Sequence, residues 1–172
     1  MPELPEVQTT VNGLNKTVRG RKIISVSTSY KSSYHNGKDN IKDPVFFKKF
    51  KKIVIGQKIL RSERRAKNVL IHLSNKYTIL VHMKMTGHFV YDKPNYPFTR
   101  LDFKLNNGKH LVLSDMRKFA KVTLVKTSDV VKMAMITEVD LQKNRRTPRF
   151  WYLEDTDEQQ VRKKIDSMLP QA

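Results

Sequence analysis

The sequence predicts an α+β protein that is mainly β, an antiparallel β-sandwich flanked by two helices and followed by a short helical C-terminal tail. Short runs of branched and aromatic residues fill residues 57–126, with turn-forming residues between several of them, as is typical of antiparallel sandwiches. Two segments before residue 57 instead carry apolar residues at helical spacing. The 172 residues, 38% of them apolar, suffice for one well-buried domain.

The first helix is predicted from an apolar stripe near the N-terminus. Apolar residues recur there every three or four positions, at Leu4, Val7, Val11, Leu14 and Val18. Pro5 favours the start of this helix and Gly20 its end. Burial of the stripe would also fix the position of the residues before it.

A strand, a loop and a second helix are predicted next. Ile24, Val26, Thr28 and Tyr30 alternate with polar residues, which indicates a half-buried strand. A polar loop follows over residues 32–42. Asp43 as N-cap and Pro44 at the first helical position then open a short helix that closes near Gly56, with Phe47 and Phe50 on one face.

The remaining strands of the domain are predicted from short runs rich in branched and aromatic residues. These runs cover residues 69–73, 77–85, 88–91, 101–105, 111–113 and 122–125. Tight turns are expected at Ser74-Asn75, at Thr86-Gly87 and at Asn106-Asn107-Gly108, and the last of these is the strongest hairpin signal.

The character of the chain changes after Lys126, which divides it into a domain over residues 1–126 and a tail over residues 127–172. Thr127 or Ser128 would cap a short helix through Ile136, and residues 143–149 form a basic linker. Thr156 and Gln159 then fit a capping box ahead of a terminal helix.

The charge of the chain points to a polyanionic partner. The formal net charge is +18, and residues 150–172 hold five acidic and three basic residues, so residues 1–149 carry +20. A compact domain with this charge repels itself unless a polyanion neutralises it. The balance fits salt-dependent binding to a nucleic-acid backbone, and a general RNA-binding protein is the alternative that charge alone leaves open.

Composition also excludes several kinds of site. The chain has no Cys, which excludes disulfides and thiolate metal sites, and its five His residues are scattered, so no metal or cofactor is expected. No run reaches the length of a membrane span and no signal peptide is apparent. A cytoplasmic, nucleoid-associated location is therefore expected.

The first residues could form a reaction centre. If Met1 is removed, Pro2 presents a secondary amine that can attack a sugar aldehyde carbon and form an iminium directly. The iminium acidifies the neighbouring sugar carbon, so that phosphate leaves by elimination, while a carboxylic acid at Glu3 protonates the ring oxygen. The alternative is that Pro2 only permits removal of Met1 and Pro5 only starts a helix.

Four motifs in this order resemble formamidopyrimidine-DNA glycosylase. They lie at residues 1–7 (Met-Pro-Glu-Leu-Pro-Glu-Val), 64–67 (Arg-Arg-Ala-Lys), 82–87 (His-Met-Lys-Met-Thr-Gly) and 115–119 (Asp-Met-Arg-Lys-Phe). The resemblance covers residues 1–126. The family continues into a helix-two-turn-helix domain and a four-cysteine zinc finger, and neither segment is found in residues 127–172.

The resemblance implies the catalytic residues. Pro2 would be the nucleophile, Glu3 the acid and Glu6 a residue that orients the terminus, while Lys67 would reach the lesion nucleotide and its phosphate. Both acids could instead complement the helix dipole, and Lys67 could instead protect a strand edge from aggregation.

The resemblance also implies the DNA-binding residues. His82 would contact a phosphate, and Met85, Arg117 and Phe119 would fill the space left by a flipped base, with the arginine facing the orphaned partner. The alternatives are an ordinary partly buried histidine, core packing for Met85 and Phe119, and surface charge for Arg117.

These observations predict a bifunctional DNA repair glycosylase and abasic-site lyase that acts on double-stranded DNA with oxidised purines such as 8-oxoguanine and formamidopyrimidines, or with abasic sites. Attack by Pro2 would release the base, and β/δ-elimination would cut the strand. The alternative is a truncated, non-catalytic protein that binds damaged DNA. Without the other two family domains, a homodimer or a partner chain is expected to complete the grip on DNA.

Overall fold

The computed structural model describes residues 3–30 and 39–130 of the chain. The chain divides into two units after Val125. Every helix and strand named below belongs to the first unit, except that Lys126, the last residue of the last strand, belongs to the second. In the second unit, residues 127–130 are helical, at the start of the helix predicted through Ile136. The rest of that helix and the predicted terminal helix lie outside the described residues.

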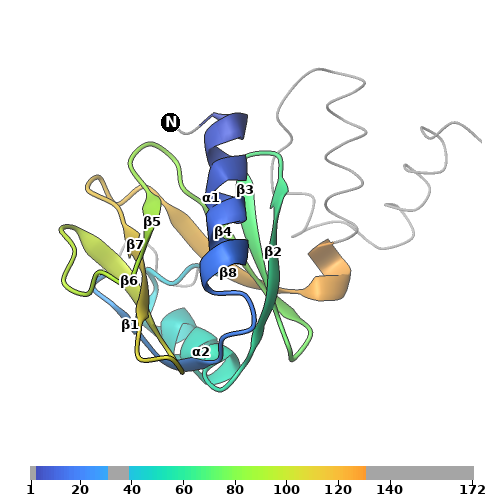
Figure 1. The fold of residues 1–172 in the computed structure, drawn as a ribbon. Coiled ribbons are helices and arrows are strands. Elements are labelled where there is room, and N and C mark those ends of the chain that lie inside the picture. The colour runs from blue at the N-terminus through green and yellow to red at the C-terminus, as the bar shows by residue number, and fades with distance from the viewer. Residues whose placement is uncertain (1–2, 31–38, 131–172) are drawn as a thin grey trace, which may run out of the picture. The chain divides into compact units, whose positions relative to one another are not determined.

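Two four-stranded sheets form the domain, as Figure 1 shows. The first has the order β1-β6-β7-β5; its strands are β1 (Ile23–Thr28), β6 (Thr99–Leu105), β7 (His110–Ser114) and β5 (His88–Tyr91). The second has the order β2-β3-β4-β8; its strands are β2 (Ile59–Arg65), β3 (Asn68–Leu73), β4 (Tyr77–His82) and β8 (Lys121–Lys126). The predicted fold, mainly β with two antiparallel sheets and few helices, is confirmed.

The core is built from the alternation of side chains along the paired strands. In the first sheet Leu101 pairs with Leu113 and Phe103 with Leu111, and all four are buried. In the second sheet the pairs Val69–Val81 and Ile71–Ile79 repeat this arrangement. Because paired residues of antiparallel strands project from the same face, each sheet presents an apolar face to one core cluster.

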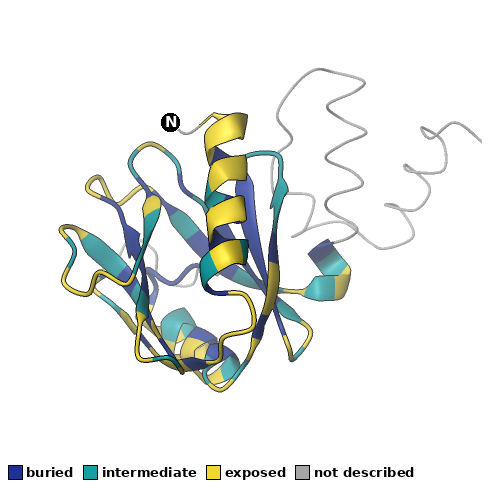
Figure 2. Cartoon of the chain, viewed as in Figure 1, coloured by how far each residue is buried: buried dark blue, intermediate teal, exposed yellow. Residues whose placement is uncertain are grey.

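Two helices cover this core, as predicted. In Figure 1, α1 (Leu4–Thr17) runs between the two sheets, and α2 (Pro44–Val54) lies at the end opposite to the start of α1. The predicted stripe of α1 is buried from Val7 to Val18 while its outer face is exposed (Figure 2). The predicted N-cap of α2 is confirmed, because Asp43 accepts a hydrogen bond from the Val45 amide at 3.1 Å.

Some local expectations were wrong. Ile24 was expected to share a face with Val26, but Ile23 is the buried residue and Ile24 is exposed. The register with β6 shifts between Ile23 and Ser25, and such a bulge inverts the alternation beyond it. Leu4 is also exposed, although it belongs to the predicted stripe of α1.

The boundaries of two strands also differ from the prediction. Strand β2 was not predicted as a separate element, because its segment from Arg61 to Arg65 is charged and carries no alternating apolar pattern. Strand β4 ends at His82 and not at Met85, since Lys84 has a φ of 55° and turns the chain.

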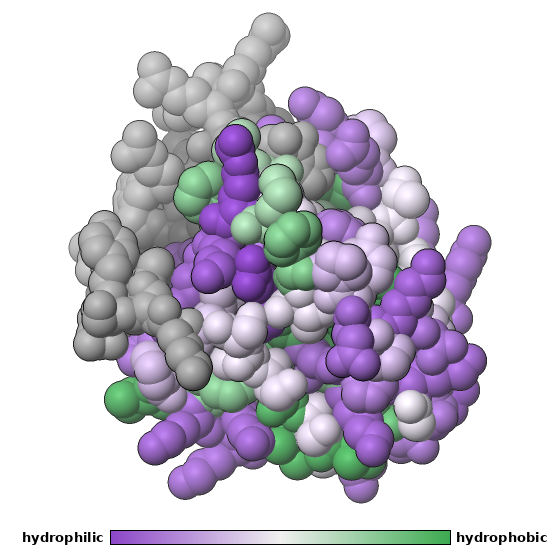
Figure 3. All heavy atoms as spheres, turned by 90° about the vertical axis from the view of Figure 1, so that its left-hand side faces the viewer, coloured by the Kyte–Doolittle hydropathy of each residue, from purple (hydrophilic) through white to green (hydrophobic). Residues whose placement is uncertain are grey.

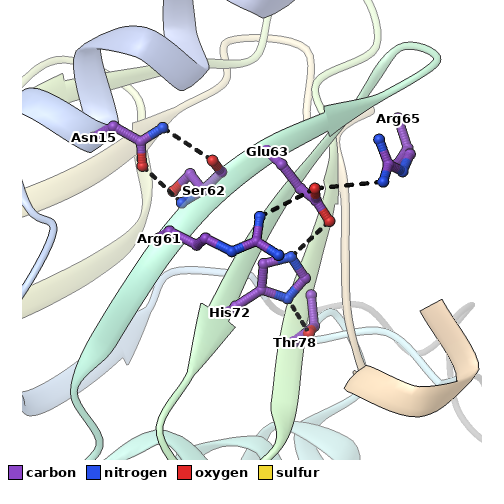
Figure 4. A network of polar contacts seen from close by, with 7 residues as sticks. All are labelled: Asn15, Arg61, Ser62, Glu63, Arg65, His72 and Thr78. Carbon is purple, nitrogen blue, oxygen red and sulfur yellow. Dashed lines mark hydrogen bonds and ion pairs between the residues drawn. The ribbon is translucent and has the colours of Figure 1, made fainter. Parts of the chain in front are cut away.

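A polar network joins β2 to its neighbours (Figure 4). Asn15 of α1 donates to the Ser62 carbonyl at 2.9 Å and accepts from the Ser62 amide at 2.7 Å. The ring of His72 lies between Thr78 Oγ1 and Glu63 Oε1, 2.8 Å from each. Burial alone would raise the pKa of Glu63, but the hydrogen bonds from His72 and Arg61 lower it below its ordinary value.

The turn after β4 requires glycine at position 87. The Gly87 amide donates to the Met83 carbonyl at 3.0 Å. A Cβ at position 87 would lie 2.5 Å from that carbonyl oxygen and 3.2 Å from the Ala120 Cβ. The absence of a side chain therefore allows the two loops that carry Met83 and Ala120 to approach each other closely.

Replacing two glycines by alanine, one at a time, should distinguish the steric need for glycine at position 87 from the ordinary effect of alanine on a helix. We expect Gly87→Ala to lower the free energy of unfolding by roughly 1–3 kcal/mol, because the methyl group overpacks the turn. Gly13→Ala should raise it by up to about 1 kcal/mol, since Gly13 lies in α1 and a Cβ there meets nothing within 4 Å. Urea unfolding measures both, and equal effects of the two changes would contradict the assignment.

Candidate functional site

The predicted acids lie at the start of α1. Glu3 is the N-cap residue of this helix and Glu6 lies in its first turn, and both are exposed. Burial of Val7 and Val11 on the other side of the helix holds this end against the core. Pro2, the predicted nucleophile, lies outside the described residues.

Arg64 joins the first half of α1 to the turn that carries Lys67. Its Nε donates to Gln8 Oε1 at 3.1 Å, and its Nη1 donates to the Ala66 carbonyl at 3.1 Å. Lys67 follows Ala66 in the turn between β2 and β3, and it is partly exposed. The second motif is thus connected through one guanidinium group to Gln8, the residue that directly follows the first motif.

His82 ends β4 in a strongly positive environment. Burial lowers its pKa to about 4, and the charges of Lys84, Lys67 and Lys121 act in the same direction. The ring is therefore neutral at pH 7. Its Nδ1 accepts a hydrogen bond from the Lys84 amide at 3.1 Å, so the proton resides on Nε2, which is left as a donor.

Met85, Arg117 and Phe119 lie on two loops that meet. Met85 follows β4, and the other two lie between β7 and β8. Arg117 Nη1 is 3.6 Å from Met85 Sδ. Met85 is 49% exposed and Phe119 is 53% exposed, so neither packs in the core, which was the alternative that the sequence left open.

The carboxyl group of Asp115 holds these two loops together. It is fully buried, and Oδ1 accepts a hydrogen bond from Thr86 Oγ1 at 2.5 Å. Oδ2 accepts from the Ala120 amide at 2.8 Å and from Tyr30 Oη at 3.1 Å. Thr86 Oγ1 in turn accepts from the Arg117 amide at 3.1 Å. One side chain therefore fixes the loop of Met85 and both ends of the loop of Arg117.

Tyr30 and Lys42 add further hydrogen bonds, one to Asp115 and one to the loop of Arg117. Burial raises the pKa of the Tyr30 phenol, and the neighbouring Asp115 carboxyl raises it further, so Tyr30 acts as a hydrogen-bond donor. Lys42 Nζ donates to the Lys118 carbonyl at 2.5 Å and lies 5.1 Å from the centre of the Tyr30 ring. Burial lowers the pKa of Lys42, and the charge of Lys84 lowers it further, whereas Asp115 opposes both effects.

Sequence reasoning missed several residues of this site. Asp115 stands in the fourth motif, but nothing in the sequence marks its side chain as buried. Tyr30 and Lys42 come from segments distant in the chain, and only the fold brings them to Asp115. Lys84 stands inside the third motif and Lys121 lies two residues after the fourth, and no pattern in the sequence indicates that both act on His82.

One face of the molecule is mostly hydrophilic. Figure 3 shows that small hydrophobic patches lie on this face among hydrophilic side chains.

Within residues 3–30 and 39–130, no group of three or more His, Asp or Glu side chains could hold a metal ion. No helix in the same ranges is long and apolar enough to cross a membrane.

The pKa of His82 predicts a pH dependence of stability. Between pH 6.5 and about 4 the unfolded chain binds a proton that the folded chain does not, so stability falls as the pH falls through this window. We expect His82→Gln to lose less unfolding free energy than the wild type between pH 7 and pH 5 in urea titrations. An identical loss in both proteins would show that the imidazole is not held neutral.

Comparison with known proteins gives a family for this arrangement. Residues 1–122 match the formamidopyrimidine-DNA glycosylase N-terminal domain. The chain is 34% identical over 143 residues to a formamidopyrimidine-DNA glycosylase of Desulforamulus reducens, covering 81% of this chain and 49% of the relative. It is 36% identical over 145 residues to one of Pelotomaculum thermopropionicum, covering 83% and 50%. The chain thus spans about half the length of these curated relatives.

Solved structures agree with this match. A complex of Lactococcus lactis Fpg with DNA containing an abasic site superposes with a TM-score of 0.67 at 26% identity, covering 80% of this chain and 49% of that one. A second complex of that protein, with DNA containing FAPY-dG, gives a TM-score of 0.66 at 27% identity and covers 79% and 49%. The motifs, the two-sheet fold and these matches together show that this chain belongs to the formamidopyrimidine-DNA glycosylase family.

Proposed function

We propose that this chain carries the catalytic part of a base-excision DNA repair glycosylase with abasic-site lyase activity. One observation carries the proposal: Met85, Arg117 and Phe119 are exposed on two loops that the buried Asp115 joins. Exposed apolar side chains beside a guanidinium suit the space left by a flipped base, because they replace lost stacking and offer donors to a base edge.

In the proposed reaction, the Pro2 amine attacks the anomeric carbon of the damaged deoxyribose. The glycosidic bond breaks and the oxidised purine leaves with the proton that the amine gives up. The Glu3 carboxyl group then gives a proton to the ring oxygen as the bond between this oxygen and the anomeric carbon breaks, which opens the sugar ring and forms an iminium. The resulting iminium allows loss of a proton from the neighbouring carbon, and the phosphate then leaves by elimination. An amine and a carboxyl group supply this chemistry, so we propose that no metal or cofactor takes part.

Other residues would hold the DNA. Glu6 would orient the chain terminus, and Lys67 would reach the lesion nucleotide and its phosphate. His82 would donate from Nε2 to a phosphate oxygen, and being neutral it adds no further charge beside Lys84 and Lys121. The net charge of +18 supports binding to the polyanion. We further propose a homodimer or a partner chain that completes the grip, and action on the nucleoid in the cytoplasm.

Covalent trapping tests the nucleophile. With Met1 removed, as checked by intact mass, the wild type should form a borohydride-stable adduct with a duplex containing 8-oxoguanine or an abasic site. Pro2→Gly should abolish most of this adduct, because a primary amine replaces the pre-oriented secondary amine. The variant should still bind the duplex, since it loses no charge.

Other outcomes of this experiment decide between the two functions. Salt-dependent binding without cleavage or trapping by the Met1-processed wild type would contradict the enzymatic proposal and favour the non-catalytic DNA-binding protein. An adduct of equal yield with Pro2→Gly would contradict the proposed need for the secondary amine of proline, and peptide mapping of the adduct would show whether the terminal amine or a lysine is the nucleophile.

Substitution of Arg117 tests the base-facing role. Arg117→Ala should reduce the discrimination between bases placed opposite the lesion by roughly tenfold, because the guanidinium donors to the orphaned base are lost. Arg19→Ala removes an equal charge from an exposed position beyond the other end of α1, and it should weaken binding to all duplexes alike. Competition binding with four duplexes that differ only in the opposite base measures both.

A further inference from the structure

Phe98 has a backbone conformation that its residue type disfavours. Its φ is 58°, in the left-handed region, where a bulky residue other than glycine is an outlier. The ring is 52% exposed, so burial of the side chain does not compensate for the strain. Strain that packing does not explain is concentrated at functional sites in proteins.

Hydrogen bonds hold the segment before β6 in this conformation. The Tyr96 carbonyl accepts from Thr99 Oγ1 at 2.5 Å, and the Pro97 carbonyl accepts from Ser114 Oγ at 2.7 Å. The Phe98 carbonyl accepts from the Asp115 amide at 3.0 Å. Three consecutive carbonyl groups are therefore fixed, and two of their donors lie on β7 and directly after it.

These contacts place Phe98 beside the loops of the proposed site. Asp115, whose amide binds Phe98, is the residue whose carboxyl group joins the loops of Met85 and Arg117. Arg100 reinforces the junction, because its Nε donates to the Asp115 carbonyl at 2.9 Å and its guanidinium lies 5.9 Å from the centre of the Phe98 ring.

The chemistry of this neighbourhood fits a nucleobase. An exposed aromatic ring next to a guanidinium, in a domain with a large positive charge, is the combination on which nucleobases of single or unpaired strands stack. A base in a bound duplex that has been opened at the lesion offers such a free face. The hydrogen bonds to the carbonyl groups of residues 96–98 hold the backbone that carries the ring in this conformation before the DNA arrives.

We propose that Phe98 is a second stacking platform, which takes a nucleobase of the bound DNA next to the damaged position, in addition to Met85 and Phe119. This inference rests on the proposed function for its choice of DNA as partner. It makes no use of Pro2 and is therefore testable by binding alone.

The test compares stability with affinity. Phe98→Gly should leave the Tm unchanged or raise it, because glycine adopts this φ without strain. The same change should weaken binding to a duplex with a stable abasic-site analogue by about tenfold, as expected for one lost stacking contact. Phe98→Trp should bind as the wild type does. Fluorescence anisotropy over a salt series should give the same slope for all three, since no charge changes.

Matched variants make the result decisive. Val45→Ala changes an exposed apolar residue on α2 and should leave the affinity unchanged. Wild-type affinity in Phe98→Gly would overturn the proposal, and so would equal weakening by Phe98→Gly and Phe98→Trp. If Phe98→Gly does not fold, Phe98→Leu replaces it: weak binding by Phe98→Leu beside normal binding by Phe98→Trp supports the platform, and equal affinities overturn it.

Borohydride trapping separates this inference from the proposed function. A wild type that traps DNA while the Phe98 variants bind normally would overturn the platform alone. A wild type that binds DNA without trapping would overturn the enzymatic proposal alone, and the affinities of the variants would still decide the role of Phe98.

Discussion

The buried carboxyl group of Asp115 is the interaction on which the candidate site depends. Its two oxygens accept hydrogen bonds from Thr86, Tyr30 and the Ala120 amide, and these donors come from three separate segments of the chain. A buried donor without a partner costs about 1–3 kcal/mol, so the loops have no equally stable alternative arrangement. The four residues from Met116 to Phe119 are exposed between the buried Asp115 and Ala120, so their side chains project from a loop that is anchored at both ends.

The N-terminal helix connects the stability of the domain to its proposed chemistry. Val7 and Val11 are buried in the core shared by both sheets, while Asn15 and Arg64 tie the helix to β2 and to the turn before β3. Glu3 and Glu6 therefore occupy defined positions, although they contribute nothing to the core. In the proposed reaction this matters because a nucleophile and an acid must meet the sugar in a fixed geometry.

Several positively charged side chains act on one histidine. Lys67, Lys84 and Lys121 all act on His82, and burial together with these charges keeps its ring neutral. Like charges that lie close together repel each other, and a bound anion relieves this repulsion. In the proposed function, these lysines would meet the phosphates of the DNA, and the exposed aromatic side chains would meet its bases.

The sequence by itself determined the fold class, both helices and most strands, because apolar periodicity and turn residues are local properties. It also placed Arg117 and Phe119 between strands, but it made Met85 the last residue of a strand that in fact ends at His82. It did not reveal β2, which is mostly exposed or half-buried and is defined by its pairing with β3, nor the bulge that exposes Ile24. The role of Asp115 and the strain at Phe98 were decided by tertiary structure alone, because hydrogen bonds between residues up to 85 positions apart leave no periodic trace in the chain.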